Sequence, residues 1–147
     1  MKFTGKNKNE VENIVNQIND FLNPKFDISD FVVSEFDGKR ITVFGSFDFC
    51  YYHNIEIYFT DVYFYSGDFE WNRNDSLKAL EIKDEYVDEK QYTTRLKFVF
   101  NTDNGKYHYN NKKIEIWASE IEFNTDTVLY HKPEKLLKGQ RIAEWLK

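Results

Sequence analysis

The chain contains little cysteine and no long apolar segment, and each of these features excludes a class of protein. One of its 147 residues is cysteine, Cys50, so no internal disulfide can form and no oxidising compartment is needed for stability. No segment approaches the roughly 18 consecutive apolar residues of a membrane-spanning helix. The polar start MKFTGKNKNE lacks the apolar stretch of a signal peptide. We therefore expect a soluble, cytoplasmic protein that does not contact a membrane.

Motifs that carry catalysis or bind cofactors are also missing. The sequence has no glycine-rich phosphate loop and no nucleophile elbow. His53, His108 and His131 are not spaced as a metal site would require. The run from Asn101 to Gly105 superficially resembles a calcium loop, but Lys112 stands where a bidentate glutamate is needed. We expect no cofactor and no metal, and a binding protein rather than an enzyme.

Aromatic residues, by contrast, are plentiful. They make up 18% of the chain, within a hydrophobic content of 41%, which suffices for a core and excludes disorder. The length fits one domain over residues 1–147. Abundant Asn, Lys, Ile, Tyr and Phe with little Ala or Pro indicate an AT-rich genome, which suggests a bacterial source.

Charge is distributed unevenly along the chain. The formal net charge is −5, but residues 26–90 hold fifteen acidic residues against six basic ones. Residues 91–147 hold seven acidic residues against ten basic ones. A concentrated negative middle favours a cationic partner and argues against DNA or RNA binding.

Helical periodicity appears at both ends of the chain. Residues 8–22 place apolar side chains at helical spacing, with Asn7 or Asn9 as N-cap and Pro24 as terminator, and we expect this helix to lie on a sheet. Its opposite face, which includes Asn19, is typical of a solvated surface. Residues 133–147 predict a short helix opened by Pro133.

Alternating residues between the two helices predict strands. Asp37-Gly38 and Asn104-Gly105 are typical of hairpin turns. The alternation predicts that Phe47, Phe49, Ile55, Ile57 and Phe59 point inward. Near Thr60-Asp61 the inward positions shift by one residue, and this parity change predicts a β-bulge there and turns Val62 and Phe64 inward after it. A second parity change of this kind occurs at Ser119-Glu120. Residues 75–90 are ambiguous, and their acidic part is expected to be a solvated loop. The pattern predicts an α+β fold with a mainly antiparallel sheet, strongly curved or a half-barrel.

The run from Phe44 to Trp71 carries the candidate binding site. Once the bulge is allowed, acidic and aromatic residues share the outward side of one strand, and Trp117 points outward from a later strand. Tyrosine and tryptophan are favoured at interfaces, and carboxylates among them would orient a basic partner. The predicted binding residues are Glu56, Tyr58, Asp61, Tyr63, Tyr65 and Trp117. Alternatively, a terminal helix covers this face and the tyrosines pack beneath it.

The leading functional hypothesis is a non-enzymatic protein that binds a basic protein partner through this face, or binds a second copy of itself as a homodimer. In size, charge and surface it resembles bacterial immunity and antitoxin-type proteins, which mask a toxin's basic active surface. The alternative is a small-molecule-binding or hydrolytic protein with a pocket inside a curved sheet, lined by Phe47, Phe49, Phe98 and Phe100. A hydrolase would use paired carboxylates such as Glu56 and Asp61. Cys50 is expected to be a half-buried structural thiol.

Overall fold

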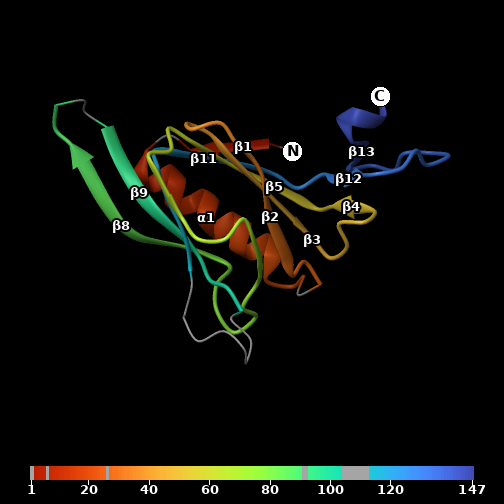
Figure 1. Ribbon diagram of the computed structural model, residues 1–147, viewed down its shortest axis with the longest axis horizontal. Coiled ribbons are helices and arrows are strands. Elements are labelled where there is room, and N and C mark those ends of the chain that lie inside the picture. The colour runs from red at the N-terminus through yellow and green to blue at the C-terminus, as the bar shows by residue number, and fades with distance from the viewer. Residues whose placement is uncertain (1, 6, 26, 91–92, 104–112) are drawn as a thin grey trace.

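The strands form three sheets in the computed structural model (Figure 1), which describes residues 2–5, 7–25, 27–90, 93–103 and 113–147. The largest sheet has the order β1-β11-β5-β3-β2-β7, and its paired strands are antiparallel. Its strands are β1 (Lys2–Gly5), β2 (Asp30–Phe36), β3 (Ile41–Ser46), β5 (Ile55–Thr60), β7 (Glu70–Asn72) and β11 (Glu120–Asn124). We call it the large sheet.

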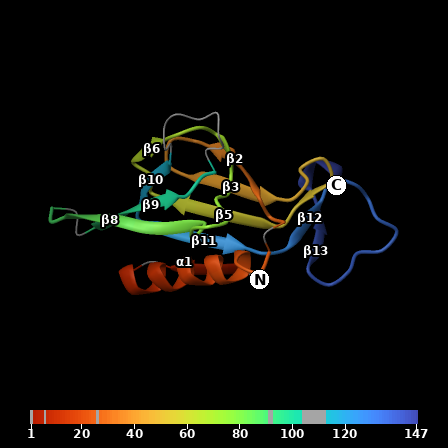
Figure 2. The ribbon, with the colours of Figure 1, turned by 90° about the horizontal axis from the view of Figure 1, so that it is seen from below.

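The second sheet has the antiparallel order β6-β10-β9-β8 and is called here the small sheet. It consists of β6 (Phe64–Ser66), β8 (Leu80–Asp88), β9 (Thr93–Phe100) and β10 (Ile114–Ala118). β8 and β9 extend away from the body of the molecule (Figures 1 and 2). The acidic residues 81–88 thus belong to a strand, and the expectation of a solvated loop there was wrong.

The C-terminal segment, defined as residues 127–147, builds the third sheet with β4 (Tyr52–His53). β12 (Thr127–Leu129) pairs antiparallel with β4 and parallel with β13 (Gln140–Ile142). A single 3-10 turn, η1 (Glu144–Leu146), is all that the structure shows of the predicted C-terminal helix. The predicted extent of 133–147 was wrong, since Gly139 takes a φ of +79° and a strand follows it.

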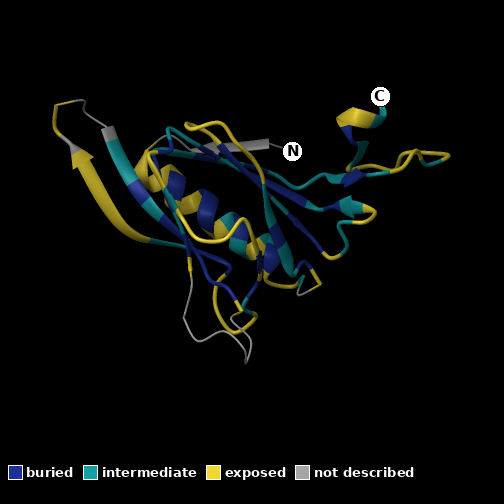
Figure 3. Ribbon diagram, in the orientation of Figure 1, coloured by how far each residue is buried: buried dark blue, intermediate teal, exposed yellow. Residues whose placement is uncertain are grey.

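One core lies between the large and small sheets (Figure 3). Alternation turns Ile57 and Phe59 inward from β5, as predicted, and Phe98 and Phe100 inward from β9. The ring of Phe59 packs edge-on against Phe98 and Phe100, at centroid distances of 5.1 and 5.9 Å. Phe98 and Phe100 are therefore packed in the core, and they do not line a pocket inside the sheet as the alternative function would require.

Helix α1 (Lys8–Leu22) covers the same core, as expected for an amphipathic helix on a sheet (Figure 2). Its buried stripe consists of Val11, Ile14, Val15, Ile18 and Leu22, and the Asn7 side chain caps it by accepting a hydrogen bond from the Glu10 N–H at 2.9 Å. Asn19, expected on the solvated face, instead exchanges two hydrogen bonds with the backbone of Leu80. Buried Arg73 donates to the Leu22 carbonyl at the helix end.

The predicted α+β class with a mainly antiparallel sheet is confirmed, although three separate sheets take the place of one strongly curved sheet. The β2–β3 hairpin is confirmed, with Asp37 accepting from the N–H groups of Lys39 and Arg40. Gly38 has a positive φ, whereas Asp37 does not, so the turn is not the predicted two-residue type. The Asn104-Gly105 turn lies outside the described residues.

Both predicted parity changes mark places where the chain crosses between sheets. After Thr60 the chain leaves the large sheet, and Asp61, at φ 56°, leads it into the small sheet, so the predicted bulge was wrong. Ser119 makes the reverse crossing, and its hydroxyl donates to the Asp61 carboxylate at 2.6 Å. Phe64, which follows the first crossing, is 49% exposed, and Phe47, in the bend after β3, is 57% exposed, against the expectation that both point inward.

Candidate functional site

The predicted binding residues do not share one face. Glu56 and Tyr58 lie on β5 in the large sheet, whereas Tyr65 and Trp117 lie on β6 and β10 in the small sheet. Asp61 is the crossing point between them. The continuous face inferred from the sequence required a bulge within one strand, and the crossing replaces that bulge.

Glu56 is buried in a polar cluster instead of facing a partner. Its side chain is 7% exposed; it forms an ion pair with Arg141 of β13 and lies 3.4 Å from the His53 Nε2 atom. Arg141 also approaches Asp126, at 3.7 Å. We call these residues, with Tyr130, the latch cluster: His53, Glu56, Asp126, Tyr130 and Arg141. The C-terminal segment thus covers Glu56, which is the alternative we raised, with a strand in place of a helix.

His53, which the sequence did not single out, is a buried member of this cluster. Its ring stacks on Phe44 at 3.9 Å, and its Nδ1 atom lies 2.6 Å from the Tyr130 hydroxyl. Burial and the charge of Arg141 lower the pKa of His53 to about 4. A neutral imidazole with its proton on Nε2, toward Glu56, accepts the Tyr130 O–H at Nδ1. Burial raises the pKa of Tyr130 to about 12, so its hydroxyl keeps its proton at neutral pH.

Three predicted residues do meet at the sheet crossing. The Tyr63 ring packs edge-on against Trp117 at 6.4 Å, and Arg95 lies over the Tyr63 ring at 4.7 Å. Arg95 also lies 3.6 Å from the Asp61 carboxylate. A guanidinium of the chain itself therefore occupies the aromatic and acidic surroundings that we predicted for a partner.

Tyr58 and Tyr65 are also held by internal contacts. Arg40 lies over the Tyr58 ring at 4.7 Å. Tyr65 stacks on Phe69 at 5.4 Å and donates its hydroxyl to the Asp68 carbonyl. Burial raises the pKa of Tyr65 to about 12.

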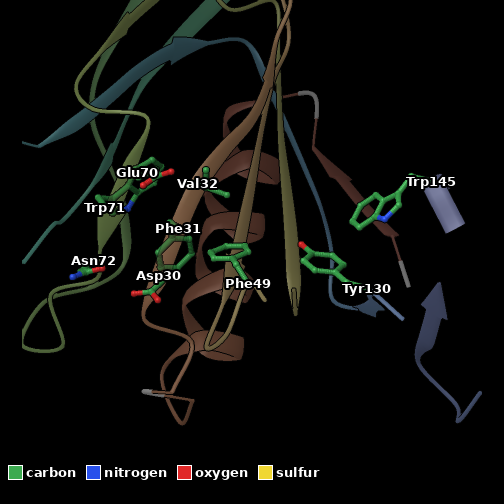
Figure 4. Close-up of a pocket in the computed structure, with 9 residues that line it drawn as sticks. All are labelled: Asp30, Phe31, Val32, Phe49, Glu70, Trp71, Asn72, Tyr130 and Trp145. Carbon is green, nitrogen blue, oxygen red and sulfur yellow. The ribbon is translucent and has the colours of Figure 1, made fainter. Parts of the chain in front are cut away.

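A groove opens where the large sheet meets the C-terminal segment (Figure 4). Its volume is about 520 Å³, and its lining combines aromatic rings with two carboxylates. The lining residues are Asp30, Phe31, Val32, Phe49, Glu70, Trp71, Asn72, Tyr130 and Trp145. None of these nine is a lysine, arginine or histidine. We call this feature the groove.

Two sides of the groove come from different parts of the chain. Asp30, Glu70 and Asn72 lie at the β2–β7 edge, and Tyr130 and Trp145 lie across from them (Figure 4). Phe49 stands between the two sides, on the turn after β3. The rings of Tyr130 and Trp145 are 4.9 Å apart, and Trp145 is 67% exposed. The latch cluster positions Tyr130, so it also fixes one wall of the groove.

Further carboxylates lie on the outer side of the large sheet. The ladder aligns Glu35, Thr42, Tyr58 and Glu122 across four strands, and Glu120 pairs with Thr60 beside them. Because Ile41, Val43, Ile57 and Phe59 face the core, these alternate residues face away from it. Glu35 is exposed, and Tyr58, Glu120 and Glu122 are partly exposed. We call Glu35, Glu120 and Glu122 the outer-face carboxylates.

Sequence reasoning missed the groove and the latch cluster. Both join residues far apart in the chain, such as His53 and Tyr130, which are 77 positions apart. The one available signal was that His53 and Glu56 are three positions apart in the sequence, which does not by itself indicate a pair. Cys50, expected to be half-buried, is exposed in the turn after β3. His131 is exposed, and His108 lies outside the described residues.

Within the described ranges, no three histidine, cysteine or acidic side chains come together as metal ligands. The helix found in those ranges is too short and too polar to cross a membrane. No protein-family model matches the chain, and neither a curated protein nor a solved structure matches it significantly.

Proposed function

We propose that this chain is a non-enzymatic binding protein that takes a basic protein partner on the outer side of the large sheet. The observation that carries the proposal is the groove, whose nine lining residues combine carboxylates and rings without a cation. The outer-face carboxylates lie on the same side of the sheet, where Arg40, over the Tyr58 ring, offsets part of their negative charge. Carboxylates of this kind steer a cationic partner toward the surface and fix its register.

The internal contacts of the predicted tyrosines support this location over the one expected from the sequence. Arg40 and Arg95 already lie over Tyr58 and Tyr63. A partner at those rings would have to displace a guanidinium of the chain. A partner that binds in the groove would displace no guanidinium from its lining, because none of the lining residues is basic.

A cytoplasmic role of the immunity or antitoxin type is the biological setting that we propose. A protein that masks a basic active surface needs an acidic surface, some aromatic anchors and no catalytic group. The net charge of −5 agrees with that requirement.

The proposal is tested by a pair of charge-matched variants. Glu35→Gln with Glu120→Gln removes two outer-face carboxylates, and Glu12→Gln with Asp20→Asn removes two exposed carboxylates of α1. Each tagged variant is used to capture partners from lysate of the source organism at low and high salt. The captured basic protein is identified by mass spectrometry, purified and titrated.

We expect the outer-face variant to weaken binding by about tenfold, because each surface charge contributes roughly 0.5–1 kcal/mol. The helix variant should bind as the unmodified protein does, and raising the salt concentration should weaken both. Equal loss in the two variants would mean that only net charge matters, and no loss in either would overturn the proposal. A dimer in light scattering with no captured partner would mean that the chain binds itself.

The groove's volume favours one other function. About 520 Å³ falls within the usual range of roughly 300–1,000 Å³ for small-molecule sites. A small organic cation would then be the ligand, and capture experiments would return no protein. Native mass spectrometry of the protein purified from its source organism would detect such a ligand directly.

A further inference from the structure

The groove presents its two carboxylates in a defined arrangement. Asp30 pairs with Asn72 across the β2–β7 ladder, and Val32 pairs with Glu70. Asp30 and Glu70 are therefore diagonal neighbours on the same side of the sheet, with backbones roughly 7–8 Å apart. A single cationic group placed between them can reach both carboxylates.

Aromatic rings lie beside these carboxylates and across the groove from them. Phe49 stands between the two sides, and Tyr130 and Trp145 form the far side (Figure 4). The hydroxyl of Tyr130 is engaged by His53, at 2.6 Å, so the position of its ring is fixed before any ligand arrives. Ring faces attract cations, and planar cations stack on them best.

The chain itself contains a smaller version of this arrangement. Arg95 lies between the Tyr63 ring, at 4.7 Å, and the Asp61 carboxylate, at 3.6 Å. A guanidinium thus satisfies a ring and a carboxylate together in this protein. Lysine has a compact, strongly hydrated charge that neither stacks nor forms a bidentate pair as well.

We propose that the groove binds an arginine side chain of the partner, with its guanidinium between Asp30 and Glu70 and its side chain packed along Phe49 toward the rings of Tyr130 and Trp145. This inference rests on the proposed function, because it names the residue by which a basic protein is anchored. The outer-face carboxylates then meet the partner's surrounding positive charge, while the groove selects arginine.

The test uses three blocked peptides of the form Gly-Gly-X-Gly-Gly, with arginine, lysine or citrulline at X. Citrulline keeps the planar shape of arginine but carries no charge. Each peptide is titrated into the full-length isotope-labelled protein, and backbone amide and tryptophan indole shifts are followed by NMR. We expect the arginine peptide to shift the signals of the Asn72 and Tyr130 amides and of the Trp145 indole. The lysine peptide should bind about tenfold more weakly, and the citrulline peptide should not bind.

Variants then locate the site. Asp30→Asn and Glu70→Gln should each weaken binding of the arginine peptide by about tenfold, and Trp145→Ala should do the same. Glu12→Gln on α1 serves as the matched control and should leave it unchanged. Spectra of the free variants report folding, and Glu70 and Trp145 are exposed enough to be replaced without disturbing the core.

Three results would overturn the inference: equal binding of arginine and lysine, binding of citrulline as tight as arginine, or no shift at the groove at millimolar peptide.

Failure of this inference is distinguishable from failure of the proposed function. If the outer-face variant still loses a captured partner, only the arginine assignment falls. If the arginine peptide binds but no basic protein is captured, the selectivity of the groove for a guanidinium stands and the proposed protein partner falls.

Discussion

At the scale of single residues, His53 and Glu56 show how burial decides the role of a charge. Both side chains are almost fully buried, and Arg141, not His53, supplies the positive charge that neutralises Glu56. His53 therefore remains neutral, and its lowered pKa of about 4 follows from burial and from the neighbouring guanidinium.

This arrangement makes stability depend on pH. The unfolded chain protonates His53 near pH 6.5, whereas the folded protein resists protonation down to about pH 4. The unfolded state thus binds more protons in this window, so the stability from neutral His53 is complete above pH 6.5 and is lost as the pH falls toward 4. The loss should amount to about 3 kcal/mol.

Urea unfolding of the protein and of His53→Gln at pH 7, 5.5 and 4.5 measures this effect. The glutamine variant lacks the titrating group, so its stability should fall less between pH 7 and 4.5. Identical pH profiles for the two proteins would contradict the assignment of a neutral, buried His53.

At the scale of elements, the C-terminal segment departs most from what its sequence predicts. Leu136, Leu137 and Trp145 have helical spacing, yet all three are exposed. Buried Val128 and Ala143 and the parallel pairing of β12 with β13 hold the segment. Local periodicity cannot predict such pairing, because its free energy comes from residues distant in the chain. The bounds of helix α1 were predicted correctly, because its apolar stripe follows from the spacing of residues within the helix itself.

The same limit explains why the candidate site was predicted only in part. Alternation along β5 correctly turned Glu56 away from the main core. It could not show that Arg141, 85 positions later, covers this carboxylate. The sequence also could not show that Asp30 and Trp145 line one groove.

We predict that Arg141→Met releases the C-terminal segment while the main core stays folded. The substitution leaves Glu56 buried without its cation, which costs about 3 kcal/mol or more. Hydrogen exchange should therefore accelerate by about 100-fold at the amides of Tyr130 and Ala143, which bond to Tyr51 and Leu129.

The amides of Ile57 and Phe59 in β5 provide the internal reference, and their exchange should change little. Adding Glu56→Gln to Arg141→Met removes the unpaired charge and should recover much of the protection. Uniform acceleration throughout the chain would instead show that the segment unfolds only with the whole molecule.

At the scale of the whole molecule, two crossings join the large and small sheets at one corner. Thr60 and Asp61 carry the chain one way, and Ser119 carries it back. The Ser119 N–H also bonds to the Thr60 carbonyl, at 3.2 Å. The parity changes in the sequence fall at both crossings, but the bulge predicted from the first was wrong, because a bulge and a crossing produce the same local pattern.

The corner has a consequence for how fast the protein folds. Asp61 and Ser119 are 58 positions apart, so joining the two sheets at this corner closes a long loop. Closing a loop of that length costs entropy before the buried contacts repay it, which slows folding. Ser119→Ala removes one hydrogen bond, worth about 1 kcal/mol, and should slow refolding about fivefold with little change in the unfolding rate.

Stopped-flow refolding and unfolding in urea separate these two rates, and Val128→Ala in the C-terminal segment is the control that should mainly accelerate unfolding. If Ser119→Ala instead leaves refolding unchanged, the corner forms after the rate-limiting step. With the expected result, a contact between two polar residues at the protein's surface would set the time that each new chain spends with its aromatic core open to aggregation.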